Sequence, residues 1–385
     1  MSSPEIFISA GDPSGEMHAA RMLAELKRLE PGASFSGIGG PGMNSVGVRL
    51  LAGIDRLAVM GLVEVLKHLG FFRRLLKDIE NYLRATPPAL IVLVDFPDFN
   101  LRIAGLAKKL NIPVLYYISP QVWAWRTARQ KNIASLADKL AVVFPFEVEF
   151  YRDQPLEVEF VGHPLLETIG SISPRTEFCF RHGLDDSRTL VGIMPGSREQ
   201  EIHRHLDIFL RAAALISAAE PGLQFAVGLL PHTTETLSHK QRHLCSKLDI
   251  RLIHDDSCEL IAHSTALITK SGTTTMEAAL HGTPMVIGYR TSPLSYLLAR
   301  RLVRVKHIGM PNLLAPPPEI PELIQDELIP EALAETTLEL VDESSDLRRR
   351  IIAQCRRVRK LLTTDKPASR RVAEIALEMY RSKSN

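Results

Sequence analysis

The stretch that most constrains the fold runs from residue 264 to residue 289 and reads STALITKSGTTTMEAALHGTPMVIGY. Residues 266–269 form a short apolar run, which is typical of a buried parallel strand. Thr274 and Glu277 have the spacing of a capping box, so we expect a helix from near Thr274 to Gly282. Residues 285–289 then have the pattern of a second strand. The stretch therefore predicts a strand–turn–helix–strand unit of a parallel α/β fold.

The same alternation of apolar runs and helical segments recurs along the chain. We expect strands near residues 6–10, 35–38, 90–94, 114–118, 140–144 and 158–161, and again near 190–194, 225–230, 250–253, 266–269 and 285–289. From Pro330 onward the sequence predicts helices. This order predicts two Rossmann-like, doubly wound domains facing a cleft, followed by C-terminal helices.

The length of the chain also favours two domains, because 385 residues exceed what one ordinary core accommodates. We place the first domain at residues 1–163 and the second at 164–364. A C-terminal helix at 365–385 completes the chain, and whether it returns to the first domain stays open. The GHP sequence at 162–164 is interpreted as the hinge.

The composition is that of a soluble globular protein, with 45% hydrophobic and 23% charged residues. The net charge of +2 gives no reason to expect nucleic acid as a partner. No apolar run is long enough to span a bilayer. The four cysteines are far apart, which favours a reducing compartment and indicates neither a metal site nor a cofactor.

Two turns in the second half carry the pattern of a phosphate site. The turn PGSR at 195–198 brings Arg198, and the turn KSG at 270–272 brings Lys270. Each follows a predicted strand and precedes a helix, whose first N–H groups and dipole attract anions. The alternative for Arg198 is a surface ion pair with Glu201, and Ser197 with Gln200 is expected to cap the helix. Two cationic turns together favour a diphosphate, although neither is a P-loop.

Carboxylates at the predicted strand ends have two interpretations each. Glu277 either caps its own helix, which its spacing favours, or accepts hydrogen bonds from ribose hydroxyls. Asp95 and Asp98 follow the strand at 90–94 and either cap a helix or supply a general base. On the first loop, Asp12 and Glu16 are rival bases.

The segment 62–83 reads LVEVLKHLGFFRRLLKDIENYL and mixes apolar with basic side chains. It is more apolar than one buried helix face requires, which is typical of an interfacial helix attracted to anionic lipid. The residues expected to face a membrane are Leu66, Leu69, Phe71, Phe72, Arg73 and Arg74. The alternative, an ordinary packed helix pair broken at Gly70, is slightly favoured by composition alone. A second patch with the same mixture covers residues 294–306.

Eight motifs, in order along nearly the whole chain, resemble those of the lipid-A-disaccharide synthase family. They are GDPSGE at 11–16, VMGLVEVL at 59–66, PDFN at 97–100, SPQVWAWR at 119–126, GHP at 162–164, PGSR at 195–198, SGT at 271–273 with Glu277, and PNLLA at 311–315. The motif WAWR and the motif PDFN are very specific. One departure is the first loop, where the family usually has Ser-Gly-Asp and a glycine two residues on, and this chain has Glu16 and His18.

The resemblance implies an inverting, metal-independent glycosyltransferase of the GT-B architecture, without a cofactor. Its reaction would join UDP-2,3-diacylglucosamine to 2,3-diacylglucosamine 1-phosphate and release UDP, as a peripheral protein at the inner face of a Gram-negative cytoplasmic membrane. Asp98 would be the general base. The residues implied for UDP are Arg198, Ser271, Gly272, Thr273, Glu277 and Asn312. Contacts of the acceptor or the first loop would be Ser14, Glu16, Trp123 and Arg126. The oligomeric state stays open.

Two rival functions share parts of this pattern. Another UDP-sugar enzyme on the same fold, an epimerase or a different transferase, would share the second half, but the segment 62–83 and the motif WAWR argue against it. A nucleotide-sugar binding module without catalysis would not need Asp98, and a turnover assay separates that rival from an enzyme.

Overall fold

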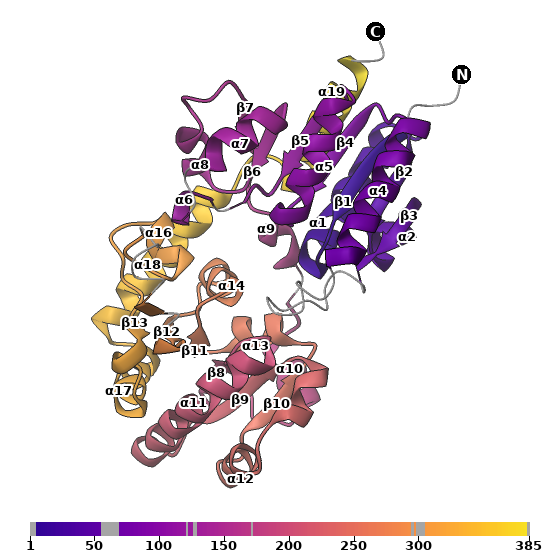
Figure 1. Ribbon diagram of the computed structural model, residues 1–385. Coiled ribbons are helices and arrows are strands. Elements are labelled where there is room, and N and C mark those ends of the chain that lie inside the picture. The colour runs from indigo at the N-terminus through magenta and orange to yellow at the C-terminus, as the bar shows by residue number, and fades with distance from the viewer. Residues whose placement is uncertain are drawn as a thin grey trace. The chain divides into compact units, whose positions relative to one another are not determined.

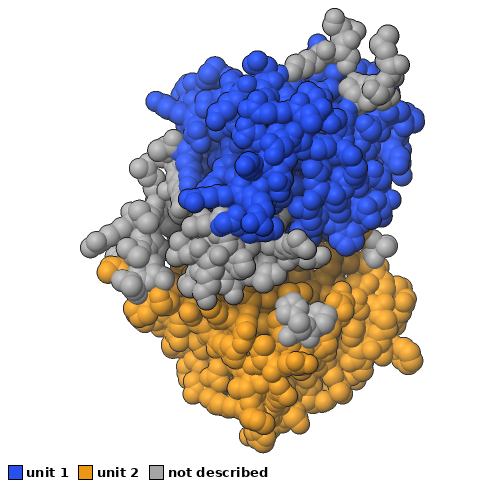
Figure 2. Space-filling view, turned by 45° about the vertical axis from the view of Figure 1, so that its right-hand side comes forward, with its two compact units in different colours: residues 1–167, 362–385 blue, residues 168–361 orange. Residues whose placement is uncertain are grey.

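The computed structural model describes residues 5–54, 69–120, 122–125, 129–170, 172–293, 296–297 and 305–382. The chain divides into two units, which Figure 2 distinguishes by colour. Unit 1 comprises Met1–Glu167 and Leu362–Asn385, and unit 2 comprises Thr168–Leu361. The C-terminal helix is therefore part of unit 1, and both divisions lie within a few residues of the predicted boundaries.

Unit 1 is built on a parallel sheet of seven strands in the order β3-β2-β1-β4-β5-β6-β7 (Figure 1). The strands are β1 (Glu5–Ala10), β2 (Ser34–Gly39), β3 (Val48–Gly53), β4 (Leu90–Val94), β5 (Val114–Tyr117), β6 (Lys139–Val142) and β7 (Glu157–Phe160). The order reverses between β1 and β4, where Ala10 pairs with Val94. Ligands of such sheets bind beyond the strand ends at this switch point.

Helices cover both faces of this sheet, because its strands are apolar on both sides. They are α1 (Pro13–Leu29), α2 (Pro41–Ser45), α4 (Leu69–Ala85), α5 (Pro97–Lys109), α6 (Val122–Trp125), α7 (Arg129–Leu136), α8 (Pro145–Phe150), α9 (Leu165–Thr168) and α19 (Ala368–Ser382). One buried core joins Phe7, Ile91 and Tyr116 to Ile79 of α4 and Ile103 of α5. The C-terminal helix α19 packs along α1, which joins the two ends of the chain in one unit (Figure 1).

Unit 2 repeats this architecture with six parallel strands in the order β10-β9-β8-β11-β12-β13. The strands are β8 (Leu190–Met194), β9 (Gln224–Leu229), β10 (Arg251–His254), β11 (Ala266–Lys270), β12 (Met285–Tyr289) and β13 (Glu322–Ile324). The order reverses between β8 and β11, and Met194 pairs with Thr269 at the ends of these strands. The two turns predicted to bind phosphate therefore lie side by side at the switch point.

The helical segments of unit 2 are α10 (Arg175–His182), α11 (Glu199–Ala219), η2 (Pro231–Thr236), α12 (His239–Lys247), α13 (Ser257–His263), α14 (Thr273–His281), α16 (Met310–Leu314), η3 (Gln325–Glu327), α17 (Pro330–Val341) and α18 (Asp346–Leu362). Helix α11 packs against α17, and α13 packs against α14. Within the described residues, no helix combines the length and the apolar character needed to cross a membrane.

The predicted α/β class and the two doubly wound sheets are confirmed. The edge strands β3 and β13 were not predicted, because neither has the continuous apolar run of a central strand. The residues around Asn312 were predicted to be a loop and instead form the short helix α16, which Pro311 starts at its first turn. Helix α1 begins at Pro13, inside the first loop, to which contacts with a ligand were assigned.

Candidate functional site

The turn after β8 is shaped by the side chain of Glu201, the third residue of α11. Its Oε2 accepts hydrogen bonds from the backbone N–H groups of Ser197 and Arg198, at 3.3 and 3.5 Å. Gly196 has φ +119°, and a Cβ there would lie 2.7 Å from the same oxygen, so the turn requires glycine. The predicted cap by Ser197 and Gln200 is wrong, because the helix starts one residue later and Glu201 supplies the carboxylate.

Glu201 also joins this turn to the one after β11. Lys270 Nζ donates to Glu201 Oε1 at 2.9 Å, and both side chains are largely buried. Burial alone would raise the pKa of Glu201, but the hydrogen bond and charge of Lys270 lower it overall. Because Glu201 neutralises Lys270, the positive charge that these two turns offer to a ligand is that of Arg198. Its guanidinium is 83% exposed and lies 3.6 Å from Glu201, a weak surface pair that leaves Arg198 available to an anion.

The turn after β11 presents the start of α14 to solvent. Gly272 is the N-cap residue and has no side-chain cap, and both Gly272 and Thr273 are exposed. Ser271 Oγ donates to the carbonyl of Ile308 at 2.8 Å, which fixes the turn to the following loop. The first N–H groups of a nine-residue helix are thus open to an anion.

Glu277 does not cap α14, so the capping interpretation is wrong. The helix begins at Thr273, which places Glu277 in the second turn, and Thr275 Oγ1 instead donates to the carbonyl of Gly272 at 2.8 Å. The Glu277 carboxyl is partly buried, and burial raises its pKa. In the described part of the chain it has no hydrogen-bond or ion-pair partner, so its oxygens are available to a ligand.

Asn312 lies in α16 and is 3% exposed. Its amide nitrogen donates to the carbonyl of Ile320 at 2.8 Å and to Glu322 Oε1 at 2.7 Å. Its oxygen accepts from the N–H of Ile320 at 3.2 Å and from Gln354 Nε2 at 3.0 Å. These four bonds use the amide completely. Asn312 is therefore bonded within the fold, where it holds the loop between α16 and β13.

In unit 1, the turn after β4 has an unusual backbone. Asp95 and Phe96 both have positive φ, 45° and 49°, which is costly for residues with a Cβ. Asn100 Nδ2 secures the turn by donating to the carbonyls of Val94 at 3.1 Å and Asp95 at 2.8 Å. A Cβ on Gly11 would lie 2.1 Å from the Phe96 ring, so the residue directly after β1 must be glycine for this turn to form.

The two acids of this turn have different surroundings. Burial, together with the nearby charge of Asp12, raises the pKa of Asp95 to about 6. Asp98, in the first turn of α5, has a side chain that is 78% exposed and pairs with Arg129 Nη1 at 3.0 Å. Neither side chain caps the helix, whose N-cap residue is Phe96, so the capping interpretation of the pair is wrong.

The first loop of unit 1 uses its acids in the fold. Asp12 is the N-cap residue of α1 and accepts from the N–H of Gly15 at 2.9 Å. Glu16 is 8% exposed, and its Oε1 accepts from the N–H of Met43 at 2.6 Å, which ties α1 to α2. Ser14 is exposed, and its hydroxyl lies 3.5 Å from His18 Nε2. Burial lowers the pKa of His18 to about 4. Of this loop, Ser14 is thus the side chain most open to a ligand.

The loop after β5 carries Trp123, while Arg126 and its neighbours at 127–128 lie outside the described residues. The Trp123 ring packs edge-on against Phe146 of α8, with centroids 4.9 Å apart. Below it, Glu147 is buried and accepts from Ser119 Oγ at 3.3 Å and from the N–H of Phe144 at 3.1 Å. Burial raises the pKa of Glu147 to about 7. Glu147 thus binds the N-cap residue of its own helix and, through Ser119, the loop after β5, a partner that is distant in sequence.

Helix α4 contains the described part of the predicted membrane segment. Arg73 and Arg74 are exposed, whereas Phe71 and Phe72 are partly buried against the core, where Phe72 lies 5.6 Å from Phe99 between ring centroids. The side chain of Leu69, all of Leu66 and the patch at 298–304 lie outside what the structure describes. The aromatic pair thus packs as in an ordinary helix, while the arginines face solvent.

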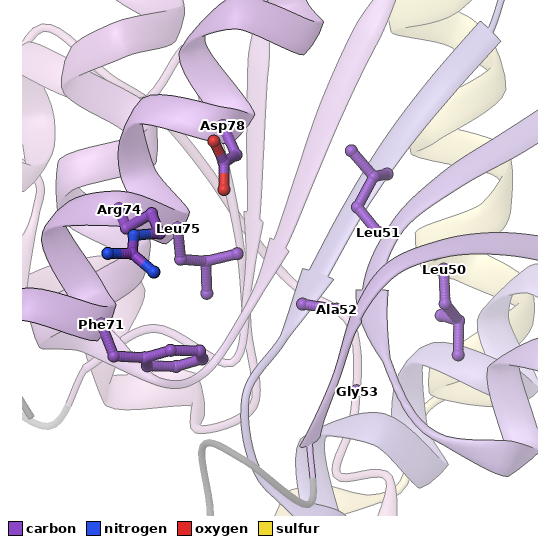
Figure 3. A pocket seen from close by; sticks show the side chains of 8 residues that line it. All are labelled: Leu50, Leu51, Ala52, Gly53, Phe71, Arg74, Leu75 and Asp78. Atoms are coloured by element: carbon purple, nitrogen blue, oxygen red, sulfur yellow. The ribbon is translucent and has the colours of Figure 1, made fainter.

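A pocket of about 480 Å³ lies between α4 and the edge strand β3. Figure 3 shows its lining: Leu50, Leu51, Ala52, Gly53, Phe71, Arg74, Leu75 and Asp78. Both elements contribute apolar side chains, and α4 adds two charged ones, Arg74 and Asp78, so the lining is mixed. Among the described residues, no group of three or more His, Cys, Asp or Glu side chains could hold a metal ion.

A sequence model of the family described as lipid-A-disaccharide synthetase matches residues 6–378. Lipid-A-disaccharide synthase of Geobacter metallireducens is 42% identical over 379 residues, which are 98% of each chain. The protein of the same description from Nitrosococcus oceani is 42% identical over 340 residues, 88% of each chain. The similarity thus includes every turn described above.

Solved structures with a similar fold are much more distant in sequence. UDP-GlcNAc 2-epimerase of Neisseria meningitidis, bound to UDP-GlcNAc, matches 98% of this chain and 100% of its own with a TM-score of 0.61 and 12% identity. A transferase of Siraitia grosvenorii in complex with UDP matches 97% and 99% with a TM-score of 0.60 and 12% identity. At this identity the likeness establishes the fold alone.

Proposed function

Because this chain belongs to the lipid-A-disaccharide synthetase family, we propose that it joins UDP-2,3-diacylglucosamine to 2,3-diacylglucosamine 1-phosphate, releasing UDP and the acylated disaccharide. The observation that carries this proposal, beyond the family, is the pair of turns at the switch point of unit 2. They combine an open helix N-terminus with a guanidinium that is 83% exposed and weakly paired. That combination suits a nucleotide diphosphate.

The diphosphate end of the donor binds unit 2. Arg198 contacts the phosphate oxygens, and the backbone of Gly272 and Thr273 contributes the N–H groups at the start of α14. Ser271 holds that turn in place through Ile308. As the bond to the anomeric carbon breaks, negative charge develops on UDP, and these groups stabilise it in the transition state. Glu277, whose carboxylate has no partner in the described chain, accepts from the ribose hydroxyls.

The acceptor binds unit 1, and Asp98 is the base that removes the proton from its attacking hydroxyl. The oxygen of that hydroxyl forms the new bond to the anomeric carbon as the bond to UDP breaks, so the configuration inverts. The support for Asp98 is its place at the carboxyl end of β4, beside the switch point, and its exposure. Its pairing with Arg129 must loosen for the carboxylate to act as a base. Ser14, Trp123 and Arg126 are proposed contacts of the acceptor, and Glu16 acts through the fold of the first loop.

The acyl chains and the membrane belong to the face of unit 1 that contains α4. The pocket between α4 and β3 offers Leu51, Phe71 and Leu75 to an acyl chain, and its charged residue Arg74 suits a lipid phosphate. The exposed Arg73 and Arg74 would bind an anionic surface. We therefore propose peripheral association with the inner face of the cytoplasmic membrane.

The test of the activity is incubation of the purified chain with both lipid substrates, followed by mass spectrometry. We expect a diacylglucosamine disaccharide 1-phosphate and an equal amount of UDP. Release of UDP without disaccharide, or an isomerised UDP-sugar, would instead identify another UDP-sugar enzyme on this fold. A product in which the new linkage has the configuration of the donor would contradict inversion.

A further inference from the structure

A buried carboxylate in unit 2 has no place in the chemistry described so far. Glu322 begins the edge strand β13, and its side chain is 7% exposed. It accepts hydrogen bonds from the backbone N–H groups of Ile308 at 2.9 Å and Gly309 at 3.0 Å. Asn312 donates to it as well, at 2.7 Å. Burying a charge is costly unless it is fully bonded, so these three donors offset the desolvation of Glu322.

The bonds of Glu322 fix the segment 307–312, which precedes and begins α16. Two successive N–H groups and one side-chain amide of this segment point at one carboxylate, so its path is set by Glu322. Gly309 makes the approach possible, because a Cβ there would lie 3.0 Å from Glu322 Oε1 and 2.5 Å from Ile287. The segment would shift if any larger residue stood at 309.

The same segment is bonded to the nucleotide turn on its other side. The carbonyl of Ile308 accepts from Ser271 Oγ at 2.8 Å, directly before the N-cap residue of α14. One residue, Ile308, therefore donates its N–H to Glu322 and accepts at its carbonyl from Ser271. If the contact with Glu322 is lost and the segment shifts, the carbonyl of Ile308 shifts with it, and so does its hydrogen bond with Ser271.

We propose that Glu322 is a positioning residue for the nucleotide diphosphate: it holds the segment 307–312, and through Ile308 it holds the Ser271 turn at the start of α14. This role rests on the proposed function, since it assumes that the turn binds a diphosphate. It also gives Asn312, whose amide is fully used inside the fold, an indirect part in the same role. Asn312 completes the bonding of the Glu322 carboxylate.

The variant that tests this role is Glu322→Gln, which keeps the shape of the side chain but brings an NH₂ group against at least one backbone donor. We expect its affinity for UDP, titrated by calorimetry, to fall about tenfold, the loss of roughly one charge-assisted hydrogen bond. KM for the UDP-sugar should rise by a similar factor, while KM for the acceptor lipid stays unchanged. The matched control is Glu319→Gln, three residues earlier, whose carboxylate pairs with Arg350 at 3.0 Å on the surface.

A second variant keeps the test decisive if Glu322→Gln folds poorly. Ser271→Ala leaves Glu322 intact and removes the bond to Ile308, so it should weaken UDP binding as well. In the double variant the two losses should be less than additive, because both act through the same segment. Full additivity, or UDP affinity unchanged in a folded Glu322→Gln or in Ser271→Ala, would overturn the proposal. If the unaltered chain fails to bind UDP at all, the proposed function itself has failed instead.

Discussion

The two sheets have the same topology at their switch points but opposite charge. In unit 2, the turns after β8 and β11 bring Arg198 and Lys270 together. In unit 1, the turns after β1 and β4 bring Asp12 and Asp95 together. The shared strand order determines where a ligand binds, and the turn residues determine what binds there. A cationic turn suits the diphosphate that leaves, and an acidic turn suits the hydroxyl that loses a proton.

The charges at the two switch points are also paired differently. In unit 2 the acid Glu201 neutralises Lys270, so among the described cations of these two turns Arg198 is the one left for a ligand. In unit 1 the charges of Asp12 and Asp95 are alike, and the pKa of Asp95 is raised to about 6. The switch point of unit 1 thus keeps two like charges and a strained turn, as functional sites often do. At the switch point of unit 2, Glu201 and Lys270 neutralise each other.

The largest effect should come from the acidic side. Asp98→Asn keeps the shape of the side chain but accepts no proton at neutral pH, so turnover should fall by about 10²–10⁴-fold. The measurement is the rate of disaccharide formation at saturating concentrations of both substrates. Asp153→Asn, at an exposed site of the same unit, is the control and should keep full turnover. Near-normal turnover in Asp98→Asn would transfer the role of base to Asp95, Asp12 or Glu16.

The cationic side should respond in binding. Arg198→Ala removes the charge-assisted contact with the diphosphate, so UDP affinity should fall by about 10- to 100-fold. Calorimetric titration of UDP measures it. Arg211→Ala, within α11 and also at an exposed site, should bind UDP as the unaltered chain does. If the two variants bind UDP with equal affinity, Arg198 does not contact the diphosphate and only pairs with Glu201 at the surface.

A smaller effect is expected at the membrane face of unit 1. Replacing Arg73 and Arg74 by Gln removes two exposed charges, each contributing about 1 kcal/mol near an anionic surface. The partition coefficient on vesicles containing anionic lipid should fall by roughly 30-fold, and the partition coefficient on neutral vesicles should not change. Arg28 and Arg152, exposed elsewhere in unit 1, supply a control pair. An unchanged partition in the Arg73/Arg74 variant would mean that α4 is an ordinary core helix.

The smallest effect concerns stability and pH. The folded chain raises the pKa of Asp95 from 3.8 to about 6, so between these values the folded state holds a proton that the unfolded state has released. Stability therefore falls as pH rises through this window, and the penalty is complete above it. Asp95→Asn removes the penalty, so its free energy of unfolding at pH 7 should exceed that of the unaltered chain by up to about 3 kcal/mol.

Urea unfolding at pH 7 and near pH 4 measures this difference. Near pH 4 the difference in stability should be much smaller, because the carboxyl of the unaltered chain is then protonated in the folded state and close to half protonated in the unfolded state. A variant that is less stable at pH 7 would show that the Asp95 carboxylate supports the turn, as Asn100 does. In that case the contrast between a balanced unit 2 and a strained unit 1 would not hold.

The central strands could be predicted from the sequence because they are buried on both faces and thus apolar without interruption. β4, β8 and β12 match the predicted ranges, since runs such as LIVLV permit little else. The edge strand β3 has one side towards solvent and contains Arg49, and β13 has only three residues, so neither gave a signal. Helix starts were misplaced where a turn and the first helical turn share residues, as at Pro13 and Glu199.

The site was predictable where a motif lies on one turn, and not where its partners are distant in sequence. The turn with Arg198 and the turn with Ser271 were recognised locally, and their adjacency follows from the strand order. Capping was assigned wrongly to Glu277, because spacing alone does not show where a helix begins. The link from Glu322 to Ile308 depends on an edge strand 13 or 14 residues downstream, which no local pattern indicates.

The central claim is that the proton acceptor and the nucleotide site lie on separate units, and one titration tests it most directly. UDP is titrated into Asp98→Asn protein whose loss of turnover has been established in the same preparation. We expect the Asp98→Asn protein to bind UDP with the same affinity as the unaltered chain, because every residue proposed for the diphosphate belongs to unit 2. A fall in UDP affinity comparable to the fall in turnover would contradict it.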